Sequence, residues 1–431
     1  MNPREIFVRR RYLHFDEPLP LTACVHLATD PARVASWAFL PFLRWEMATR
    51  KVRRDQEGVL VKKEKRRPIC YAAHKDAAIY AYYGHVLGQR YEVELARKGL
   101  QANVTAFRAG QGKCNIDFAF EVFDWIRRHG ECVALTFDVK SFFDRLDHTR
   151  LKAQWCRLLG VERLPADHYA VFRSLTRYAA VDRQAVFEEF DISPHKPRAN
   201  GRKRICTPTE FRERVRGNGL VQRNPEHRGI PQGSPMSAVL SNIYMLDFDA
   251  AVEEMTHEAG GLYRRYCDDM LVVIRPEWAG RIEAIVNQRI QDERLEVQAD
   301  KTKSHHFPGL PGAGSVDQPL QYLGFLFDGS RVLLRTASVA RYYRKMRGGV
   351  QLAVLTKRKH DRLRRKQGLE PEPLKRRKLN RLYSYLGRHN FIAYALRAAK
   401  RMDEHCIRRQ VKPHWMKLEA EVEKTLAKLQ D

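Results

Sequence analysis

The fold depends on residues 262–274, which read LYRRYCDDMLVVI. Two apolar, strand-like runs, 262–266 and 270–274, flank the dipeptide Asp268-Asp269, which therefore occupies a tight connection between two strands. An Asp-Asp dipeptide taken alone is usually a solvated turn. A further acid, Asp138, lies at the end of another apolar run, ECVALTFDV at 131–139, and taken alone could be a helix cap or half of an ion pair.

The three acids taken together indicate a metal site. Side chains alternate along a strand, so the turn can aim one carboxylate of the pair toward the end of a neighbouring strand. If that neighbour carries Asp138, the like charges repel unless a cation lies between them. Hard oxygen ligands select Mg²⁺ or Mn²⁺. Two such ions about 3.5–4 Å apart can activate an attacking hydroxyl and neutralise a departing phosphate.

Charge is unevenly distributed along the chain. The 431 residues include 78 Lys and Arg against 51 Asp and Glu, a net charge of +27, and 44% are hydrophobic, as in a globular protein. Residues 331–431 alone carry +19, which leaves +8 for the first 330. This excess favours a polyanion-binding module beside a more balanced body, and the alternative is a basic tail that only confers solubility.

Other sequence features exclude several classes of protein. No apolar run reaches 18 residues and the N-terminus has no apolar signal core, so we expect a cytoplasmic protein without a membrane partner. The eight cysteines include no CxxC pair, which argues against a zinc module or a disulfide scaffold.

The order of predicted elements describes an α+β body followed by a helical appendage. Helices are expected over 74–97, from about 149 to a cap at Gly160, and from Ser234-Pro235 to just before Gly260. Asp328-Gly329 indicates a hairpin between 320–327 and 331–334, the basic stretch 195–228 is expected to be a long loop, and everything beyond 335 is expected to be helical.

Seven motifs, in order over roughly residues 60–330, resemble those of reverse transcriptases. Each is weak or moderate alone, and the ordered set is specific. They are Lys65-Arg66-Arg67-Pro68-Ile69, Phe107-Arg108-Ala109-Gly110, Asp138 to Asp144 (DVKSFFD), Gly229 to Ser237 (GIPQGSPMS), Tyr266-Cys267-Asp268-Asp269, Gln298 to Thr302 (QADKT) and Tyr322-Leu323-Gly324-Phe325. The family often has Asn where Gln298 stands.

The resemblance implies a right-hand polymerase, an α+β fold with fingers, a palm built on an antiparallel sheet, and a basic helical thumb. The boundaries expected from it are an N-terminal extension at 1–55, fingers at 56–130, palm at 131–150 and 221–330, a fingers/palm insertion at 151–220, and a thumb or RNA-binding region at 331–431.

The resemblance also implies the catalytic residues. Asp138 and Asp268 would hold two Mg²⁺ ions, with Mn²⁺ as an alternative, and the backbone carbonyl of Val139 would be a further ligand. Asp269 would be a supporting carboxylate near the primer 3′ end. The reaction implied is in-line attack of a 3′-hydroxyl on the α-phosphate of a nucleotide, in which positioning and charge neutralisation supply nearly all the catalysis.

Several residues are expected to bind the incoming nucleotide. Lys65 and Arg67 would contact the triphosphate, although both could be solvated loop charges. Phe143 would lie under the sugar and exclude a 2′-hydroxyl; the alternative is that Phe143 is core and Phe142 faces the sugar. Lys301 could protonate the leaving group, and the alternative is an ordinary surface lysine. Gln232 and Gly233 would let the backbone approach nucleotide and template, and the alternative is a plain helix-entry turn.

Further residues are expected to bind the nucleic acid itself. Tyr322, Leu323 and Gly324 resemble the primer grip, with a bulge glycine as the alternative for Gly324. The basic residues expected to contact the nucleic-acid backbone are Arg108, Arg344, Lys345, Arg364, Arg365, Arg376 and Arg377.

Two short stretches, RYLHFD at 11–16 and AHKDAAIY at 73–80, together with the Tyr-Cys-Asp-Asp form, look most like the type 2 class of defence-associated reverse transcriptases of bacteria. That resemblance implies a structured noncoding RNA as template and scaffold, dNTPs as substrates, and repetitive cDNA as product in anti-phage defence. The sequence makes no prediction of an oligomeric state.

Three alternatives stay open. One is template-independent or protein-primed DNA synthesis, as in abortive-infection relatives. Another is an RNA-binding or splicing-assistance protein whose polymerase fold is dispensable. An RNA-directed RNA polymerase is disfavoured by the aromatic Phe143.

Overall fold

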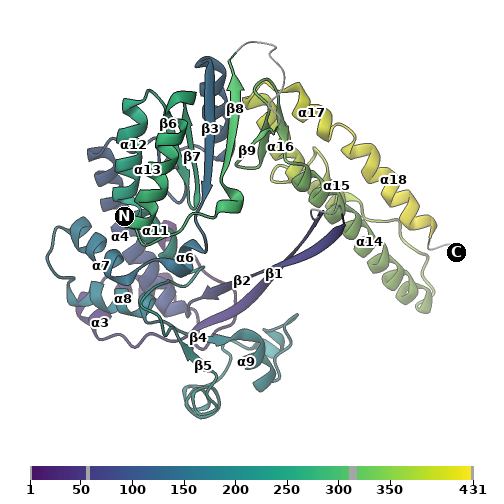
Figure 1. Ribbon diagram of the computed structural model, residues 1–431. Coiled ribbons are helices and arrows are strands. Elements are labelled where there is room, and N and C mark those ends of the chain that lie inside the picture. Colours follow the sequence, from purple (N-terminus) through teal and green to yellow (C-terminus); the bar gives the residue numbers. More distant parts are fainter. Residues whose placement is uncertain (1, 55–58, 310–317, 429–431) are drawn as a thin grey trace.

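A four-stranded antiparallel sheet forms the centre of the molecule. The computed structural model describes residues 2–54, 59–309 and 318–428 (Figure 1). The strand order is β6-β7-β3-β8. The strands are β3 (Glu131–Asp138), β6 (Leu262–Tyr266), β7 (Asp269–Ile274) and β8 (Lys303–Pro308). Strands β6 and β7 form the hairpin predicted from the sequence, and β3 pairs with β7 so that Asp138 lies opposite Asp269.

The two faces of this sheet pack into two different cores, because alternate residues of a strand point to opposite sides. Val133, Leu135 and Phe137 of β3 belong to a large core with helices α4, α7, α11, α12 and α13. Cys132 and Ala134 instead pack with α5, α16, α17 and a small sheet. The helices on these faces are α4 (His74–Arg97), α5 (Asn115–Arg128), α7 (His148–Leu159), α11 (Ser237–Tyr244), α12 (Leu246–Glu258) and α13 (Ala279–Asp292).

A second sheet carries the long β1–β2 hairpin, which projects from the helical body as an extended ribbon (Figure 1). Its order is β2-β1-β4-β5, with β1 (Phe42–Arg54), β2 (Leu60–Tyr71), β4 (Ala179–Asp182) and β5 (Val221–Arg223). Helix α9 (Arg183–Glu189) contacts β1 and β4. The other short elements of the first 220 residues are α1 (Pro3–Ile6), α2 (Leu21–Ala28), α3 (Pro31–Ala35), α6 (Phe142–Arg145), α8 (Ala166–Thr176), η1 (Ala199–Gly201), α10 (Pro208–Glu210) and η2 (Phe211–Arg216).

The C-terminal region is helical and basic, as predicted. A short antiparallel sheet of β9 (Leu320–Tyr322), β10 (Phe325–Phe327) and β11 (Val332–Leu334) leads into it. Its helices are α14 (Thr336–Lys366), α15 (Arg377–Tyr383), α16 (Phe391–Arg401), α17 (His405–Val411) and α18 (His414–Ala427). A separate small core, which includes Met346, Val350 and Leu418, joins α14, α15 and α18.

The sequence located most elements and misplaced three boundaries. Helix α4 matches the predicted range, and Gly160 caps α7 with a φ of 70°. Ser234-Pro235 does not open the next helix, because a turn occupies these residues and the helical stretch is interrupted at Met245, between α11 and α12. Residues 195–228 contain η1, α10, η2 and β5 rather than a long loop.

The third misplaced boundary is the run 320–327, which is two strands joined by a tight turn at Leu323-Gly324. The β10–β11 hairpin across Asp328-Gly329 is confirmed. Throughout the ranges that the structure describes, no helix combines the length and the apolar character needed to cross a bilayer.

Candidate active site

The three acids that the sequence singles out meet at one edge of the central sheet. Asp138 is the last residue of β3, Asp269 is the first of β7, and the two are paired in register. The Val139 N–H donates to the backbone carbonyl of Asp268 at 3.3 Å, which attaches the β6–β7 turn to the end of β3. Cys267 adopts a φ of 62°, and this left-handed residue lets the chain reverse between the strands.

The carboxylates lie close enough to influence one another. Loss of hydration at this edge, followed by the charges of Asp268 and Asp138, raises the pKa of Asp269 to about 6. The Lys301 ammonium forms an ion pair with Asp138 Oδ1. Lys301 belongs to η4 (Ala299–Lys301), which is placed at the site because the Gln298 N–H donates to the Asp138 carbonyl at 2.8 Å.

The donor set suits a hard divalent cation. Among the residues that the structure describes, no group of three or more His, Cys, Asp and Glu side chains is arranged as a complete metal-binding set. The carboxylates nevertheless come from adjacent strand ends. After burial, the charges of Asp268 and Asp138 are the next causes that raise the pKa of Asp269, and Lys301 supplies a positive charge beside Asp138. Carboxylate and carbonyl oxygens are the ligands that Mg²⁺ and Mn²⁺ prefer.

A buried ion pair holds the turn from behind, and the sequence analysis missed it. The side chains of Arg265 and Asp249 are both 0% exposed, and Arg265 Nε donates to Asp249 Oδ1 at 2.7 Å. The same guanidinium donates to the carbonyl of Cys267 and to Asn242 Oδ1, each at 3.1 Å. Tyr263 adds a hydrogen bond to Asp249 at 2.7 Å. The backbone between Tyr266 and Asp268 is therefore fixed by a charged group from its own strand.

Phe143, rather than Phe142, is the aromatic residue that stays accessible. Phe142 is 3% exposed and lies in the core, whereas Phe143 is half-buried at its margin. The Ile230 N–H donates to the Phe143 carbonyl at 2.9 Å, so the Gly229 to Ser237 segment runs beside this ring. This arrangement favours the sequence interpretation in which Phe143 faces the nucleotide sugar.

The Gln232-Gly233 turn packs directly on β2. The Cys70 N–H donates to the Gln232 carbonyl at 2.8 Å. Gly233 has a φ of 112°, and a Cβ added there would lie 2.5 Å from the Cys70 carbonyl oxygen, so a glycine is required. The turn is therefore joined to the strand that carries Lys65 and Arg67.

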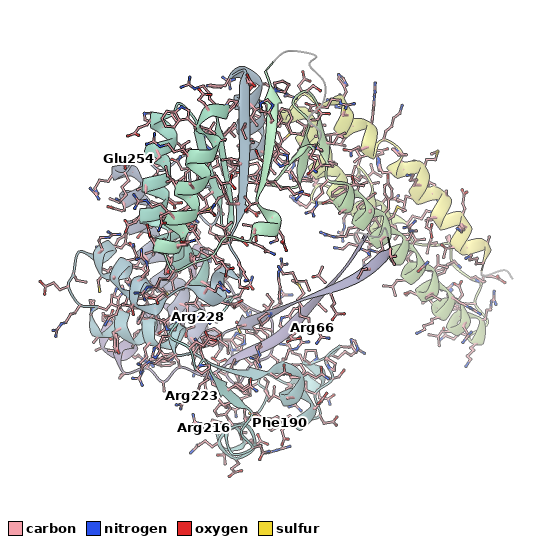
Figure 2. All side chains as sticks on the ribbon, viewed as in Figure 1. Arg66, Phe190, Arg216, Arg223, Arg228 and Glu254 are labelled. Atoms are coloured by element: carbon pink, nitrogen blue, oxygen red, sulfur yellow. The ribbon has the colours of Figure 1, made fainter. Side chains whose placement is uncertain are left out.

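Lys65 and Arg67 are exposed on β2, on the opposite side of the strand from Arg66. Arg66 forms ion pairs with Glu46 and Glu64 and is labelled in Figure 2. In the described part of the chain, Lys65 and Arg67 have no ion pair, which leaves both charges available for a ligand.

The Tyr322-Leu323-Gly324 turn joins β9 to β10 and is hydrogen-bonded to residues outside the small sheet. Gly324 has a φ of 96° and Leu323 a φ of 45°, so two successive residues are left-handed. The Leu323 carbonyl accepts from Asn115 Nδ2 at 3.1 Å, and the Gly324 carbonyl accepts from the Arg335 N–H at 3.0 Å. Apart from its two chain neighbours, no described residue has an atom within 4 Å of a Cβ placed on Gly324, so that side of the turn is open.

The structure does not support Arg108 as a nucleic-acid contact. Its side chain is 5% exposed, pairs with Glu92, and donates to the carbonyls of Gln101 and Val104. Its charge is therefore used inside the protein, where it ties the start of the loop before α5 to α4. No local pattern indicates this ion pair, because Glu92 lies 16 residues before Arg108 in the chain.

The six basic residues expected on the C-terminal helices fall into two groups. Arg364 pairs with Glu372, and Arg376 pairs with Glu419. The other four are exposed and have no ion pair within the described ranges: Arg344, Lys345, Arg365 and Arg377. These four are the better candidates for phosphate contacts.

Carboxylates that converge at the end of an antiparallel sheet are the arrangement expected of a nucleotidyl-transferring polymerase with a palm domain. The family described as Reverse transcriptase (RNA-dependent DNA polymerase) matches residues 61–327, which is more than half of the chain. The chain belongs to this reverse transcriptase family, whose members are nucleotidyltransferases.

Solved structures with similarity to the chain include telomerases. Apo telomerase from Candida tropicalis has 11% identity and a TM-score of 0.42, over 73% of this chain and 55% of that chain. Telomerase from Candida albicans in complex with a TWJ fragment of telomeric RNA has 13% identity and a TM-score of 0.38, over 77% and 53%. The chain thus spans about half the length of these telomerase chains. No curated protein matches it.

Proposed function

We propose that this protein is an RNA-directed DNA polymerase that copies a dedicated structured noncoding RNA into repetitive cDNA in bacterial anti-phage defence. The observation that carries the polymerase assignment is the register that sets Asp138 opposite Asp269, with Asp268 attached to the same strand end. The domain boundaries proposed are those expected from the sequence, with fingers at 56–130, palm at 131–150 and 221–330, and thumb at 331–431.

In this proposal the residues at the sheet edge place the reactants. Asp138, Asp268 and the Val139 carbonyl would hold two divalent ions, and Asp269 would orient the primer end. Bound Mg²⁺ or Mn²⁺ supplies activation of the 3′-hydroxyl and neutralisation of the departing pyrophosphate. Lys301, which pairs with Asp138, would exchange this ion pair for the triphosphate and would give a proton to the leaving group.

Substrate choice follows from the surroundings of this site. Lys65 and Arg67 would bind the triphosphate from the hairpin, Gln232 and Gly233 would bring the backbone close to the base pair, and the Phe143 ring would exclude a 2′-hydroxyl. The open turn at Gly324 and the unpaired cations of α14 and α15 would bind primer and RNA.

The defence assignment rests on a finer resemblance that the packing supports. The two stretches that carry it, 11–16 and 73–80, lie against each other: the Tyr12 and His74 rings stack with centroids 4.9 Å apart. Asp16 accepts from the backbone N–H groups of His74 and Lys75, both at 2.8 Å. The similarity therefore covers one packed unit rather than two unrelated segments.

Primer extension on a defined RNA template tests the proposed activity. Purified wild-type protein is expected to add dNTPs complementary to the template only when Mg²⁺ or Mn²⁺ is present, and Asp268→Asn is expected to reduce the rate by at least about 10³-fold. Asp144→Asn is the control, since this acid lies on the same motif and is not among the proposed ligands. Extension that ignores the template sequence would favour template-independent synthesis. Equal rates for Asp268→Asn and wild type would refute the assignment.

A further inference from the structure

A pocket of about 690 Å³ lies at the N-terminal end of the molecule, among α1, α2 and the start of α4. Its volume is in the range that encloses small ligands. None of the residues assigned to polymerase chemistry lines it. It is therefore a separate feature of the molecule that the proposed function leaves unused.

The lining of this pocket is cationic on one side and apolar on the other. Three arginines line it, Arg4, Arg9 and Arg10, and no acidic side chain does. None of the three forms an ion pair with any residue in the described ranges. Phe7 and Leu19 are among the apolar lining residues. Three uncompensated guanidinium groups beside an apolar wall suit a molecule that is anionic at one end and flat and apolar at the other.

His74 supplies the second observation. It lines the pocket and is 7% exposed, and its Nε2 atom is buried without a hydrogen-bond partner among the described residues. Buried polar atoms are rarely left unpaired, because each costs the free energy of its lost hydration. Burial lowers the pKa of His74, so Nε2 of the neutral ring can accept from a ligand hydroxyl, and a bound anion would restore the proton that lets it donate.

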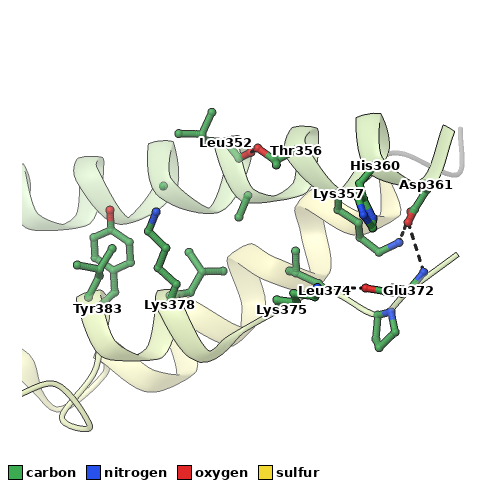
Figure 3. A pocket seen from close by; sticks show the side chains of 15 residues that line it. Leu352, Thr356, Lys357, His360, Asp361, Glu372, Leu374, Lys375, Lys378 and Tyr383 are labelled. Atoms are coloured by element: carbon green, nitrogen blue, oxygen red, sulfur yellow. Dashed lines mark hydrogen bonds and ion pairs between the residues drawn. The ribbon is translucent and has the colours of Figure 1, made fainter. Parts of the chain in front are cut away.

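A cavity of about 620 Å³ in the C-terminal region differs from the N-terminal pocket in its charge. Figure 3 shows the pocket between α14 and α15, where Asp361 pairs with Lys357 and Glu372 pairs with Lys375. Of the three lysines that line it, only Lys378 has no ion pair among the described residues, so that pocket holds less uncompensated charge than the three arginines supply. The helix N-terminus is not the source of the charge in the N-terminal pocket either, since Asp16 already accepts the first two N–H groups of α4.

We propose that the N-terminal pocket binds a phosphorylated nucleoside, with its phosphate on Arg9, Arg10 and Arg4 and its base against the apolar wall, with Nε2 of His74 as a hydrogen-bonding partner. The ligand is either a free nucleotide or the terminal nucleotide of an RNA, since both present the same chemistry. Its site is distinct from the carboxylates at the sheet edge and does not depend on the proposed polymerase activity.

Equilibrium binding measurements on the full chain test this proposal. The protein is freed of nucleic acid and kept in EDTA, so that the polymerase site cannot bind a nucleotide through a metal ion. The probes are AMP, adenosine, inorganic phosphate, and one RNA oligonucleotide with either a 5′-phosphate or a 5′-hydroxyl. AMP is expected to bind more tightly than adenosine or phosphate alone. The Arg9→Ala/Arg10→Ala double variant is expected to weaken AMP binding at least about tenfold.

The control is Arg11→Ala, which removes a neighbouring exposed arginine that does not line the pocket and is expected to leave binding unchanged. His74→Phe is expected to weaken AMP binding because it removes the unpaired Nε2. Its melting temperature is measured in parallel, because the His74 ring also interacts with the Tyr12 backbone and stacks on the Tyr12 ring. An effect of Arg9→Ala/Arg10→Ala confined to the 5′-phosphorylated oligonucleotide would identify an RNA end as the ligand.

Two results would overturn the proposal. In one, neither AMP nor the 5′-phosphorylated oligonucleotide loses affinity in Arg9→Ala/Arg10→Ala. In the other, inorganic phosphate binds as tightly as AMP, which would show that the apolar wall makes no contribution to recognition. Polymerase activity is measured in parallel, and its loss or retention bears on the proposed function alone.

Discussion

Replacing Asp249 by Asn tests how the catalytic turn is held in place. Asp249 and Arg265 are fully buried, and the same guanidinium that binds Asp249 also donates to the Cys267 carbonyl. Asn removes the compensating charge and directs an amide N–H₂ at a group that can only donate. Breaking a buried pair in this way costs about 3–5 kcal/mol of unfolding free energy.

The matched control lies two residues earlier on the same helix. Asp247 pairs with Arg157, and the two side chains are 36% and 56% exposed. Such exposed pairs contribute about 0–1 kcal/mol, so Asp247→Asn is expected to be mild. Urea unfolding of the two variants and wild type measures the difference, and primer extension under conditions where all are folded measures the effect on the turn.

Asp249→Asn is expected to lose at least about 3 kcal/mol and also polymerase rate, because the Cys267 carbonyl loses a rigidly placed donor. If the two variants lose the same free energy to within about 1 kcal/mol, the buried pair does not support the turn as described.

Three further predictions concern the nucleotide, the fingers contact and the pH dependence of stability. Phe143→Ala is expected to raise the ratio of NTP to dNTP incorporation at least about tenfold, measured as kcat/KM, and an unchanged ratio would remove the steric argument. Gly233→Ala is expected to destabilise the protein more than Gly99→Ala. Both positions have a positive φ, which costs an alanine about 1–2 kcal/mol, but only at Gly233 would the added Cβ clash with the Cys70 carbonyl oxygen. Equal melting temperatures for the two variants would contradict this. Burial raises the pKa of the Asp76 carboxyl from 3.8 to about 7, so the folded state keeps a proton that the unfolded state releases. The stability that this group contributes is therefore complete below pH 4 and is lost as the pH rises through 7. Asp76→Asn is expected to gain melting temperature relative to wild type from pH 4 to pH 7, and parallel curves would contradict the assignment.

The sequence could locate the acids because their signals are local. Asp138 ends one apolar run, and Asp268-Asp269 lie between two others. A strand can be recognised from the alternation of only a few residues. The pairing of Asp138 with Asp269 needed one further assumption, that the two strands are neighbours, which the structure confirms. The motif from Gly229 to Ser237 also ended beside the predicted site, although its helix begins later than its Ser-Pro signal indicated.

The residues that support the site could not be found in this way. Arg265 follows Arg264 in β6, and nothing in the run LYRRY indicates which of the two arginines is buried. Asp249 lies on a helix among other acids. Their pairing depends on how α12 packs against β6, which no local pattern records. For the same reason Arg108 resembled a nucleic-acid contact until its partner Glu92, on α4, was placed beside it.

In the proposed function, the carboxylates at the sheet edge catalyse the copying of one RNA into DNA. Sequencing the RNA and the DNA that copurify with tagged wild-type protein and with Asp268→Ala/Asp269→Ala tests it most directly. We expect one dominant small RNA in both samples and complementary DNA only with wild type, in head-to-tail repeats. DNA whose sequence is unrelated to any bound RNA, or DNA recovered equally from both proteins, would contradict it.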